Sequence, residues 1–431
     1  MARLLAALVA CALLASFAPG AAAARPTRPP PGAASIPLTG EQRLLVMRVT
    51  WGPEPFTEDV VHDVVFAQTA AFMRASSFGK TWIVGEQTPW LHALASQPFC
   101  DTRAIAEAGR QAAQAAGYDL SRFNRYAFLF PRVDCGWSGL GGDDTIFLNG
   151  QLSRKLVAHE LGHTYGLGHA KSWDCAGRTC TESEYGDLYD TMGGGQGDFN
   201  VFEKSRLGWI TSTLTADRDG VYTIDRPDRP SVLPQALVVE TARRDYWFEN
   251  RQEQVPFAGG VLPTGVLVRV SGRLGVSTTL ELLPEASLLL PSAAGVGQAA
   301  LQPAQTFTAA GAFSVTVNTQ VDGQVALGFR WLDRTAPAAP EIVTPTARPA
   351  RRATLKVTWR QPIETGSGVG AYEVSLDGRA ALAVPPGVMP TTLATFRMPA
   401  RGPHKLTVWA IDRAGNRGQA AVRRFVVGRS P

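Results

Sequence analysis

Hydrophobic residues recur with two different periods along the first half of the chain. Continuous or alternating apolar runs at 44–50, 81–84 and 126–130 predict strands. Apolar residues spaced three and four positions apart at 58–75 and 101–116 predict amphipathic helices. Strands that alternate with helices are typical of α/β architectures. We therefore expect an α/β (α+β) domain in this half of the chain.

The helical spacing stops after Trp209, and residues 213–333 contain short apolar runs separated by Gly, Pro and Asp. This pattern predicts a β-rich, sandwich-like companion domain. Residues 334–349 are rich in Pro, Thr and Ala, which is typical of a linker. Residues 350–431 alternate as strands between turns and are similar to an immunoglobulin-like or fibronectin type III-like module.

The first 24 residues have the layout of a secretory signal peptide. Arg3 precedes an apolar run, and alanines occupy positions 21–24. A Pro/Ala-rich linker at 25–37 follows, so we expect a secreted protein whose catalytic part begins near residue 38. No later apolar run reaches the length of a transmembrane helix. Lipid attachment at Cys11 is disfavoured because this cysteine lies in the middle of the apolar run.

Four of the five cysteines remain after removal of the signal peptide, and an even number in an exported chain indicates two disulfides. The sequence separations favour Cys175 with Cys180 and Cys100 with Cys135. A second zinc site made of cysteines is disfavoured because paired CxxC spacing is missing.

The segment HELGHTYGLGH at 159–169 concentrates metal-ligating residues. His159 and His163 lie one turn apart on the same face of a helix, where both imidazoles can reach one ion. The chain must turn before His169 to add a third ligand, and Gly166 can adopt the left-handed conformation that ends a helix. Three histidines leave one position of a zinc ion open for water. Glu160, beside the first ligand, is then placed as the general base.

This motif resembles HExxHxxGxxH of the metzincin metalloproteases, which is followed by a Met-turn. Met192, in the segment YDTMG, is expected to form the apolar floor of the site. The stretches EYGDLYDTMGGG at 184–195 and FEKSRLGWI at 202–210 are most similar to gametolysin-type peptidases. The resemblance implies a metzincin-like catalytic domain at 38–212. It also implies that the strand at 145–148 is an edge strand that pairs with extended peptide substrate.

Two features depart from the family. Some metzincins carry an oxyanion-stabilising tyrosine two residues after the Met-turn methionine, where this chain has Gly194. The tyrosines nearby in sequence give no assignment; they are Tyr165, Tyr185 and Tyr189. The chain also lacks room for a long inhibitory pro-segment with a cysteine that caps the zinc, so we do not expect a cysteine switch.

Charge is distributed unevenly between the two ends of the chain. Residues 334–431 carry 15 lysines and arginines against five acidic residues, although the whole chain has a net charge of only +5. The basic module could bind acidic polymers of the cell envelope or matrix, although scattered arginines also serve solvation. Nucleic acid is disfavoured because the basic residues are not interleaved with stacking aromatics.

These observations predict a secreted zinc endopeptidase that cleaves extracellular or cell-envelope proteins, with Glu160 as the base. Two alternatives remain: a zinc-containing surface or matrix binding protein, and a hydrolase of cell-wall peptide amides. The intact Glu160 argues against the first. The sequence does not decide whether Asp143 and Asp144 bind calcium.

Overall fold

The computed structural model describes residues 37–176, 179–210, 212–252, 264–272, 287–290, 299–347, 349, 352–386 and 391–428. The predicted signal peptide, the lipid-attachment cysteine and nearly all of the 25–37 linker lie outside these residues. Among the described residues, no helix has the length and apolar character needed to cross a membrane.

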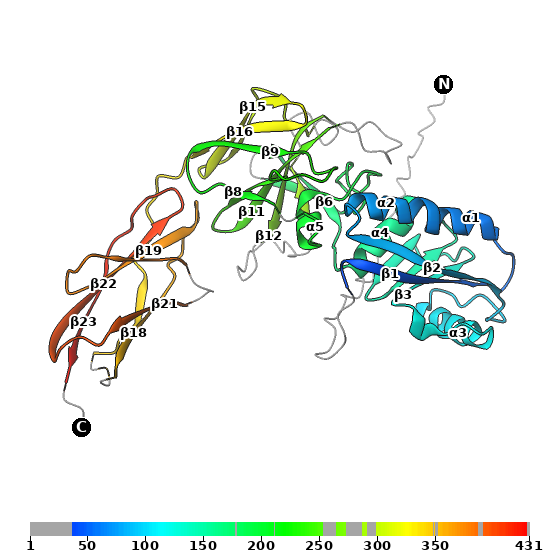
Figure 1. Ribbon diagram of the computed structural model, residues 1–431, viewed down its shortest axis with the longest axis horizontal. Coiled ribbons are helices and arrows are strands. Elements are labelled where there is room, and N and C mark those ends of the chain that lie inside the picture. Colours follow the sequence, from blue (N-terminus) through cyan, green and yellow to red (C-terminus); the bar gives the residue numbers. More distant parts are fainter. Residues whose placement is uncertain are drawn as a thin grey trace, which may run out of the picture. The chain divides into compact units, whose positions relative to one another are not determined.

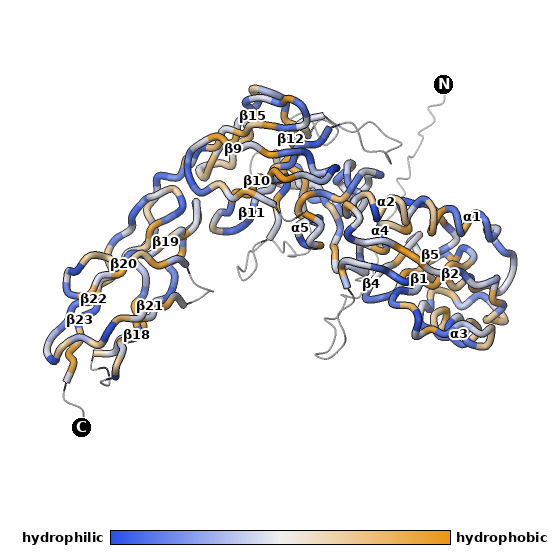
Figure 2. Tube along the Cα trace, viewed as in Figure 1, coloured by the Kyte–Doolittle hydropathy of each residue, from blue (hydrophilic) through white to orange (hydrophobic). Residues whose placement is uncertain are grey.

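The N-terminal sheet has the strand order β2-β1-β3-β5-β4 (Figure 1). Neighbouring strands are parallel except β4, which runs antiparallel to β5. The bounds are β1 Gly40–Val49, β2 Thr81–Leu91, β3 Arg125–Phe130, β4 Gly139–Gly142 and β5 Thr145–Asn149. Hydrophobic stretches occur in the strands of this sheet (Figure 2), and the residues of β1 from Leu44 onward are buried.

Helices cover both faces of this sheet because successive strand residues point to opposite sides. Leu44 and Val46 pack with the helices that precede β2 and with α4 (Arg154–Thr164). Leu45 and Met47 pack instead against α3 (Thr102–Ala115). The predicted helix at 58–75 is one continuous helical stretch with a π-helical middle. Its parts are α1 Glu58–His62, η1 Asp63–Thr69 and α2 Ala70–Ser76. A short 3-10 turn, η2 (Leu120–Arg122), precedes β3.

A second sheet draws strands from both sides of the predicted boundary at 212/213. Its order is β7-β6-β13-β12-β11-β10-β8. The bounds are β6 Ala170–Ala176, β7 Thr179–Ser183, β8 Leu214–Thr215, β10 Leu237–Glu240, β11 Arg244–Arg251, β12 Gly265–Gly272 and β13 Ser287–Leu289. Strand β6 pairs in parallel with β13. The hairpin β6–β7 directly after the third histidine is therefore part of the sheet formed by the later region. Helix α5 (Val201–Arg206) lies between β7 and β8 in the sequence.

A third sheet packs against the second. Its order is β14-β15-β16-β9, with bounds β9 Gly220–Asp225, β14 Thr306–Ala309, β15 Phe313–Val321 and β16 Gln324–Trp331. Phe248 and Val268 of the second sheet share a core with Phe313 and Leu327 of the third. Residues 214–331 thus contribute to a sandwich of two sheets, in agreement with the expected β-rich region.

The C-terminal region contains two further sheets around a core of its own. Their orders are β17-β18-β21 and β20-β19-β22-β23. The bounds are β17 Glu341–Thr344, β18 Thr354–Arg360, β19 Val369–Leu376, β20 Leu382–Val384, β21 Thr391–Arg397, β22 Gly402–Asp412 and β23 Ala421–Val427. Trp359 and Tyr372, with ring centroids 5.2 Å apart, lie in this core. Strand β17 lies within the predicted 334–349 linker. This part of the predicted linker therefore belongs to the folded C-terminal region, because its residues pair with β18.

Strands predominate over helices in the described chain, which confirms the β-rich character expected after residue 212. The metzincin-like form of the catalytic domain stays a prediction.

Candidate metal centre

Helix α4 carries the first two histidines of the motif. The hydroxyl of Ser153 accepts a hydrogen bond from the backbone N–H of Leu156 at 3.1 Å, which caps the first turn. Val157 and Leu161 bury one face of the helix in the core of the N-terminal domain. The helix ends at Thr164, and Gly166 follows with φ +82°, a left-handed conformation that glycine adopts without a Cβ penalty.

The turn brings His169 back to His159 and His163. One ring nitrogen from each histidine lies within 4.8 Å of the others. Within the part of the chain that the structure describes, this is the one group of His, Cys, Asp or Glu side chains with such spacing, so Asp143 and Asp144 do not belong to a comparable cluster. The three imidazoles therefore form a candidate metal centre.

Hydrogen bonds to backbone carbonyls orient the first two rings. Nδ1 of His159 lies 2.9 Å from the carbonyl oxygen of Thr191, and Nδ1 of His163 lies 2.9 Å from that of Leu167. A carbonyl oxygen can only accept, so each Nδ1 carries the proton and donates. The lone pair of each Nε2 is then available to a metal ion, as in most histidine-ligated sites.

A carboxylate orients the third ring. Nδ1 of His169 lies 2.6 Å from Oε1 of Glu184, and the other oxygen of Glu184 lies 2.7 Å from Nζ of Lys171. Glu184 was not predicted as part of the site. Its spacing from His169 gave no signal, because the contact depends on the β6–β7 hairpin that separates them.

Burial adapts the histidines to metal binding. Burial lowers the pKa of His159 to about 3, and the neighbouring His163 adds to this shift. The pKa of His163 falls to about 4 for the same reason, against the opposing hydrogen bond to Leu167. Both rings are neutral near pH 7, as metal ligands must be. Three imidazoles fit a cation that accepts nitrogen ligands, such as zinc.

Glu160 lies on the same helix and is almost completely buried, with 4% of its surface exposed. Burial raises the pKa of its carboxyl group to about 8, and Lys155 opposes this shift. A cation held by the histidines would oppose it further, since positive charge favours the carboxylate. Strand β4 passes directly over this residue: a Cβ on Gly139 would lie 2.2 Å from Glu160 Oε1, and one on Gly141 would lie 2.3 Å from the Glu160 carbonyl oxygen.

The prediction that residues 145–148 form the edge strand is wrong. Strand β5 lies between β3 and β4 in the sheet, and β4 is the edge. The reason is that the short, glycine-rich segment 139–142 folds back antiparallel onto β5. Sequence analysis missed this segment because its GLGG sequence has little strand propensity.

Met192 lies beneath helix α4 and is fully buried. A Cβ on Gly162 would lie 2.3 Å from its sulfur, so the helix approaches the methionine closely at this glycine. The backbone N–H of Ala170, next to His169, donates to the Met192 carbonyl oxygen at 3.1 Å. The methionine thus lies under two parts of the site, in a position suited to an apolar floor.

The three tyrosines near the motif occupy different surroundings. The ring of Tyr185 lies 4.4 Å from that of His169 and 5.9 Å from that of His159, between centroids. Tyr165 is buried and packs against Trp209. Tyr189 belongs to a small apolar cluster with Leu267 and Leu289. Tyr185 is therefore the phenol beside the metal ligands.

Cys100 and Cys135 form a disulfide with a Cα–Cα distance of 5.5 Å. Cys175 and Cys180 are register partners in the β6–β7 hairpin, but their side chains lie outside the described residues.

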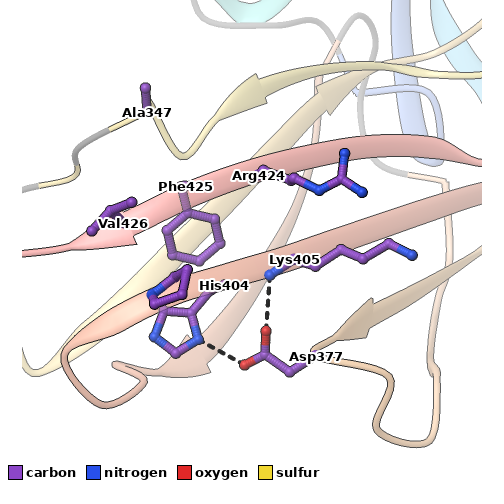
Figure 3. A pocket seen from close by; sticks show the side chains of 8 residues that line it. Ala347, Asp377, His404, Lys405, Arg424, Phe425 and Val426 are labelled. Atoms are coloured by element: carbon purple, nitrogen blue, oxygen red, sulfur yellow. Dashed lines mark hydrogen bonds and ion pairs between the residues drawn. The ribbon is translucent and has the colours of Figure 1, made fainter.

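A concave surface belongs to the C-terminal region (Figure 3). This pocket of about 550 Å³ is lined by Ala347, Asp377, Pro403, His404, Lys405, Arg424, Phe425 and Val426. It contains none of the metal-centre residues. Nδ1 of His404 lies 2.8 Å from Asp377 Oδ2, and the two hydrogen bonds that His404 makes raise its pKa despite the opposing effect of burial. Lys405 and Arg424 are directly opposite each other on β22 and β23.

Comparison with known proteins gives a family match over the segment that contains the metal centre. Residues 75–237 match the model of the gametolysin peptidase M11 family. The resemblance to gametolysin-type metallopeptidases is confirmed. All three histidines, Glu160 and Met192 lie within this gametolysin-type segment, whereas strands β11 and β12 lie beyond it. No curated protein matches the chain.

Several solved structures resemble small parts of the chain. Fibronectin(III)-like modules of Clostridium thermocellum CbhA match with 14% identity and a TM-score of 0.18, covering 21% of this chain and 99% of that one. The fibronectin type-III domain of human fibronectin type III domain containing protein 3 matches with 18% identity and a TM-score of 0.17, covering 22% and 93%. The PKD domain of an M14-like peptidase from the Thermoplasmatales archaeon SCGC AB-540-F20 matches with 11% identity and a TM-score of 0.19, covering 22% of this chain and 98% of that one. These similarities are too weak to carry a functional argument.

Proposed function

We propose that the protein is a secreted zinc endopeptidase in which Glu160 is the general base. The observation that carries this proposal is the convergence of three oriented imidazoles beside one buried carboxyl group on the same helix. The match to a metallopeptidase family supports a protein or peptide substrate. The signal-like N-terminus and the Cys100–Cys135 disulfide support export, because disulfides persist in oxidising compartments.

Each residue of the site has a separate part in hydrolysis. His159, His163 and His169 would hold zinc, which supplies Lewis-acid chemistry and lowers the pKa of a bound water to about 7. Glu160 would take a proton from the attacking water and return it to the leaving amine. Glu184 keeps the His169 ring in the orientation that metal binding requires.

Substrate would bind as an added strand along β4. This strand is the edge of its sheet and lies next to Glu160. Backbone hydrogen bonds to an edge strand give affinity that depends little on sequence. Leu140, with 44% of its surface exposed, is the one side chain larger than hydrogen on β4. Choice between substrates would then depend mainly on residues outside this strand.

Cleavage of casein or gelatin by the purified protein tests this proposal. We expect cleavage that stops with a zinc chelator, returns with added zinc and is absent in Glu160→Gln. The variant should still bind one zinc ion. A folded, zinc-loaded protein that cleaves neither substrate but releases peptides from peptidoglycan would support the cell-wall amide hydrolase instead. Zinc binding without hydrolysis of any of these substrates would support the binding protein.

The C-terminal region supplies a candidate surface for an acidic polymer. Lys405 and Arg424 are cross-strand neighbours, and like charges placed directly opposite repel each other unless an anion lies between them. Binding of the full chain to immobilised acidic polysaccharide, compared with the variant Lys405→Gln/Arg424→Gln, tests this part of the proposal. Equal binding by both proteins would exclude these two residues from it.

A further inference from the structure

Arg269 is a fully buried arginine in the middle of β12, more than thirty residues beyond the gametolysin-type segment. Its Nε donates a hydrogen bond to Asp187 Oδ2 at 2.8 Å. Its Nη1 makes an ion pair with Oε1 of Glu249 on β11. A buried charge needs such partners, because burial without them is costly. Arg269 thus joins one carboxylate from the metallopeptidase segment to one from the following sheet.

Asp187 connects this ion pair to the metal centre. The other oxygen of its carboxylate, Oδ1, accepts from the backbone N–H of Tyr189 at 2.9 Å, which shapes the chain that leads to Met192. Its own backbone N–H donates to the carbonyl oxygen of Ala170 at 3.2 Å. Ala170 directly follows His169 and also bonds to the Met192 carbonyl oxygen. The position of Asp187 therefore influences a metal ligand and the floor of the site together.

Glu249 acts on the other side of the Met-turn. Its Oε2 accepts from the backbone N–H of Val201, the first residue of α5, at 2.9 Å. Its Oε1 also accepts from Nε of Arg251 at 3.0 Å. Arg251 in turn donates to the carbonyl oxygen of Phe199 at 3.2 Å. Phe199 packs in the same core as Met192 and α4, so Glu249 and Arg251 fix the segment that supports the metal-binding helix from below.

Sheet pairing strengthens the same connection. Strand β6 begins at Ala170, pairs with β13 and through it lies next but one to β12. In this register Ala170 faces Ser287, and Arg269 faces Leu289. The strand that follows the third histidine is therefore anchored to the strand that carries Arg269 by both backbone and side-chain contacts.

We propose that Arg269 and Glu249 are positioning residues of the metal centre, acting through Asp187, Val201 and the Met-turn. This inference rests on the proposed metal site, although neither residue touches a ligand. Removing Arg269 leaves the Asp187 carboxylate buried without its cationic partner and leaves Glu249 with Arg251 alone, so Asp187 and the adjacent backbone must rearrange. His169 and Met192 then lose their alignment. Residues that orient metal ligands typically contribute 10- to 100-fold to metal affinity, and we expect a loss of this order.

The test measures metal binding, which is independent of peptidase activity. Zinc affinity of the full chain is determined by competition with a chromophoric chelator, and the absorption spectrum of the cobalt(II)-loaded protein reports ligand geometry. Arg269→Met is expected to weaken zinc binding about 10-fold or more and to change the cobalt spectrum. Arg269→Lys keeps the charge and should recover part of the affinity. The matched control is Arg330→Met, which removes an exposed arginine from β16 and should change neither measurement.

The outcomes separate the two proposals. A wild-type chain that binds no zinc at its histidines would refute the proposed function itself. A wild-type chain that binds zinc, together with a folded Arg269→Met variant of unchanged affinity and spectrum, would overturn the positioning role alone. If Arg269→Met does not fold, Glu249→Gln replaces it, because this variant removes the charge but keeps the shape and an acceptor oxygen. Unchanged affinity and spectrum in that variant would likewise overturn the inference.

Discussion

Gly139 and Glu160 are in direct contact: a single carbon added at position 139 would lie 2.2 Å from Oε1 of Glu160, the proposed general base. The edge strand β4 and the Glu160 carboxyl group are therefore closely packed against each other. Any side chain at this position must displace the end of Glu160, which is flexible enough to move. The glycine therefore leaves room for the carboxyl group beside β4.

Gly139→Ala is expected to lower kcat by about tenfold or more, because a displaced base loses part of the contribution of 10²–10⁴ that proton transfer makes. Zinc content should not change. Gly142→Ala is the matched control, since a Cβ at 142 meets no atom within 4 Å. Equal kcat values for the two variants, measured on one peptide substrate, would show that the contact at 139 does not constrain Glu160.

The raised pKa of Glu160 predicts a pH-dependent stability difference in the metal-free protein. Its pKa is about 8 in the folded state and 4.5 is the ordinary value, so the unfolded chain releases this proton at lower pH than the folded chain does. Stability is therefore lost as pH rises from about 4.5 to 8. Glu160→Gln cannot ionise and should be more stable than the wild type at pH 9 by on the order of a few kcal/mol.

Urea denaturation of both metal-free proteins at pH 5, 7 and 9 measures this difference. It should be small at pH 5, grow up to about pH 8 and then level off. A difference that stays constant over this range would mean that the carboxyl group titrates normally.

Tyr185 is expected to assist turnover more than substrate binding. Its phenol is beside the metal ligands, and burial, together with Glu160 and Glu184, raises its pKa, so the hydroxyl stays protonated and can donate to negative charge on a reacting carbonyl oxygen. Tyr185→Phe should lower kcat about tenfold or more and change KM little. Tyr189→Phe, which alters a tyrosine packed away from the ligands, is the comparison. An increase in KM alone would assign Tyr185 to substrate binding.

The Cys100–Cys135 disulfide should stabilise the N-terminal domain. It closes a loop with a sequence separation of 35. Bonds of this kind typically contribute about 2–4 kcal/mol, mainly by restricting the unfolded chain. Cys100→Ser/Cys135→Ser should therefore lower the denaturation midpoint of the metal-loaded protein. Because this bond lies away from the histidines in sequence, zinc affinity measured under native conditions should change little.

The metal centre could be predicted from sequence because its geometry is mostly local. The spacing of His159 and His163 fixes their common helix face, and Gly166 provides the turn to His169. Strands with a continuous apolar run, such as β1 and β3, were also predicted. The edge strand was assigned wrongly because pairing order, unlike strand content, depends on how a weakly patterned segment such as GLGG folds back.

The residues that support the metal centre could not be predicted from the sequence, for a different reason. Glu184, Glu249 and Arg269 are ordinary charged residues in the sequence, and only burial and long-range pairing give them a role. Nothing in the local pattern distinguishes Arg269 from the many exposed arginines of this chain. Such residues become recognisable once the sheet that connects β6 to β12 is known.

The parallel pairing of β6 with β13 has a practical consequence for building chimaeras from this protein. A cut at 212/213 would separate β6 from the strand that completes its sheet and would expose backbone groups that are now paired. The region after 333 has its own sheets and its own apolar core. The smallest unit that keeps the metal centre and its sheet intact therefore extends to about residue 333, whereas the C-terminal module can be exchanged separately.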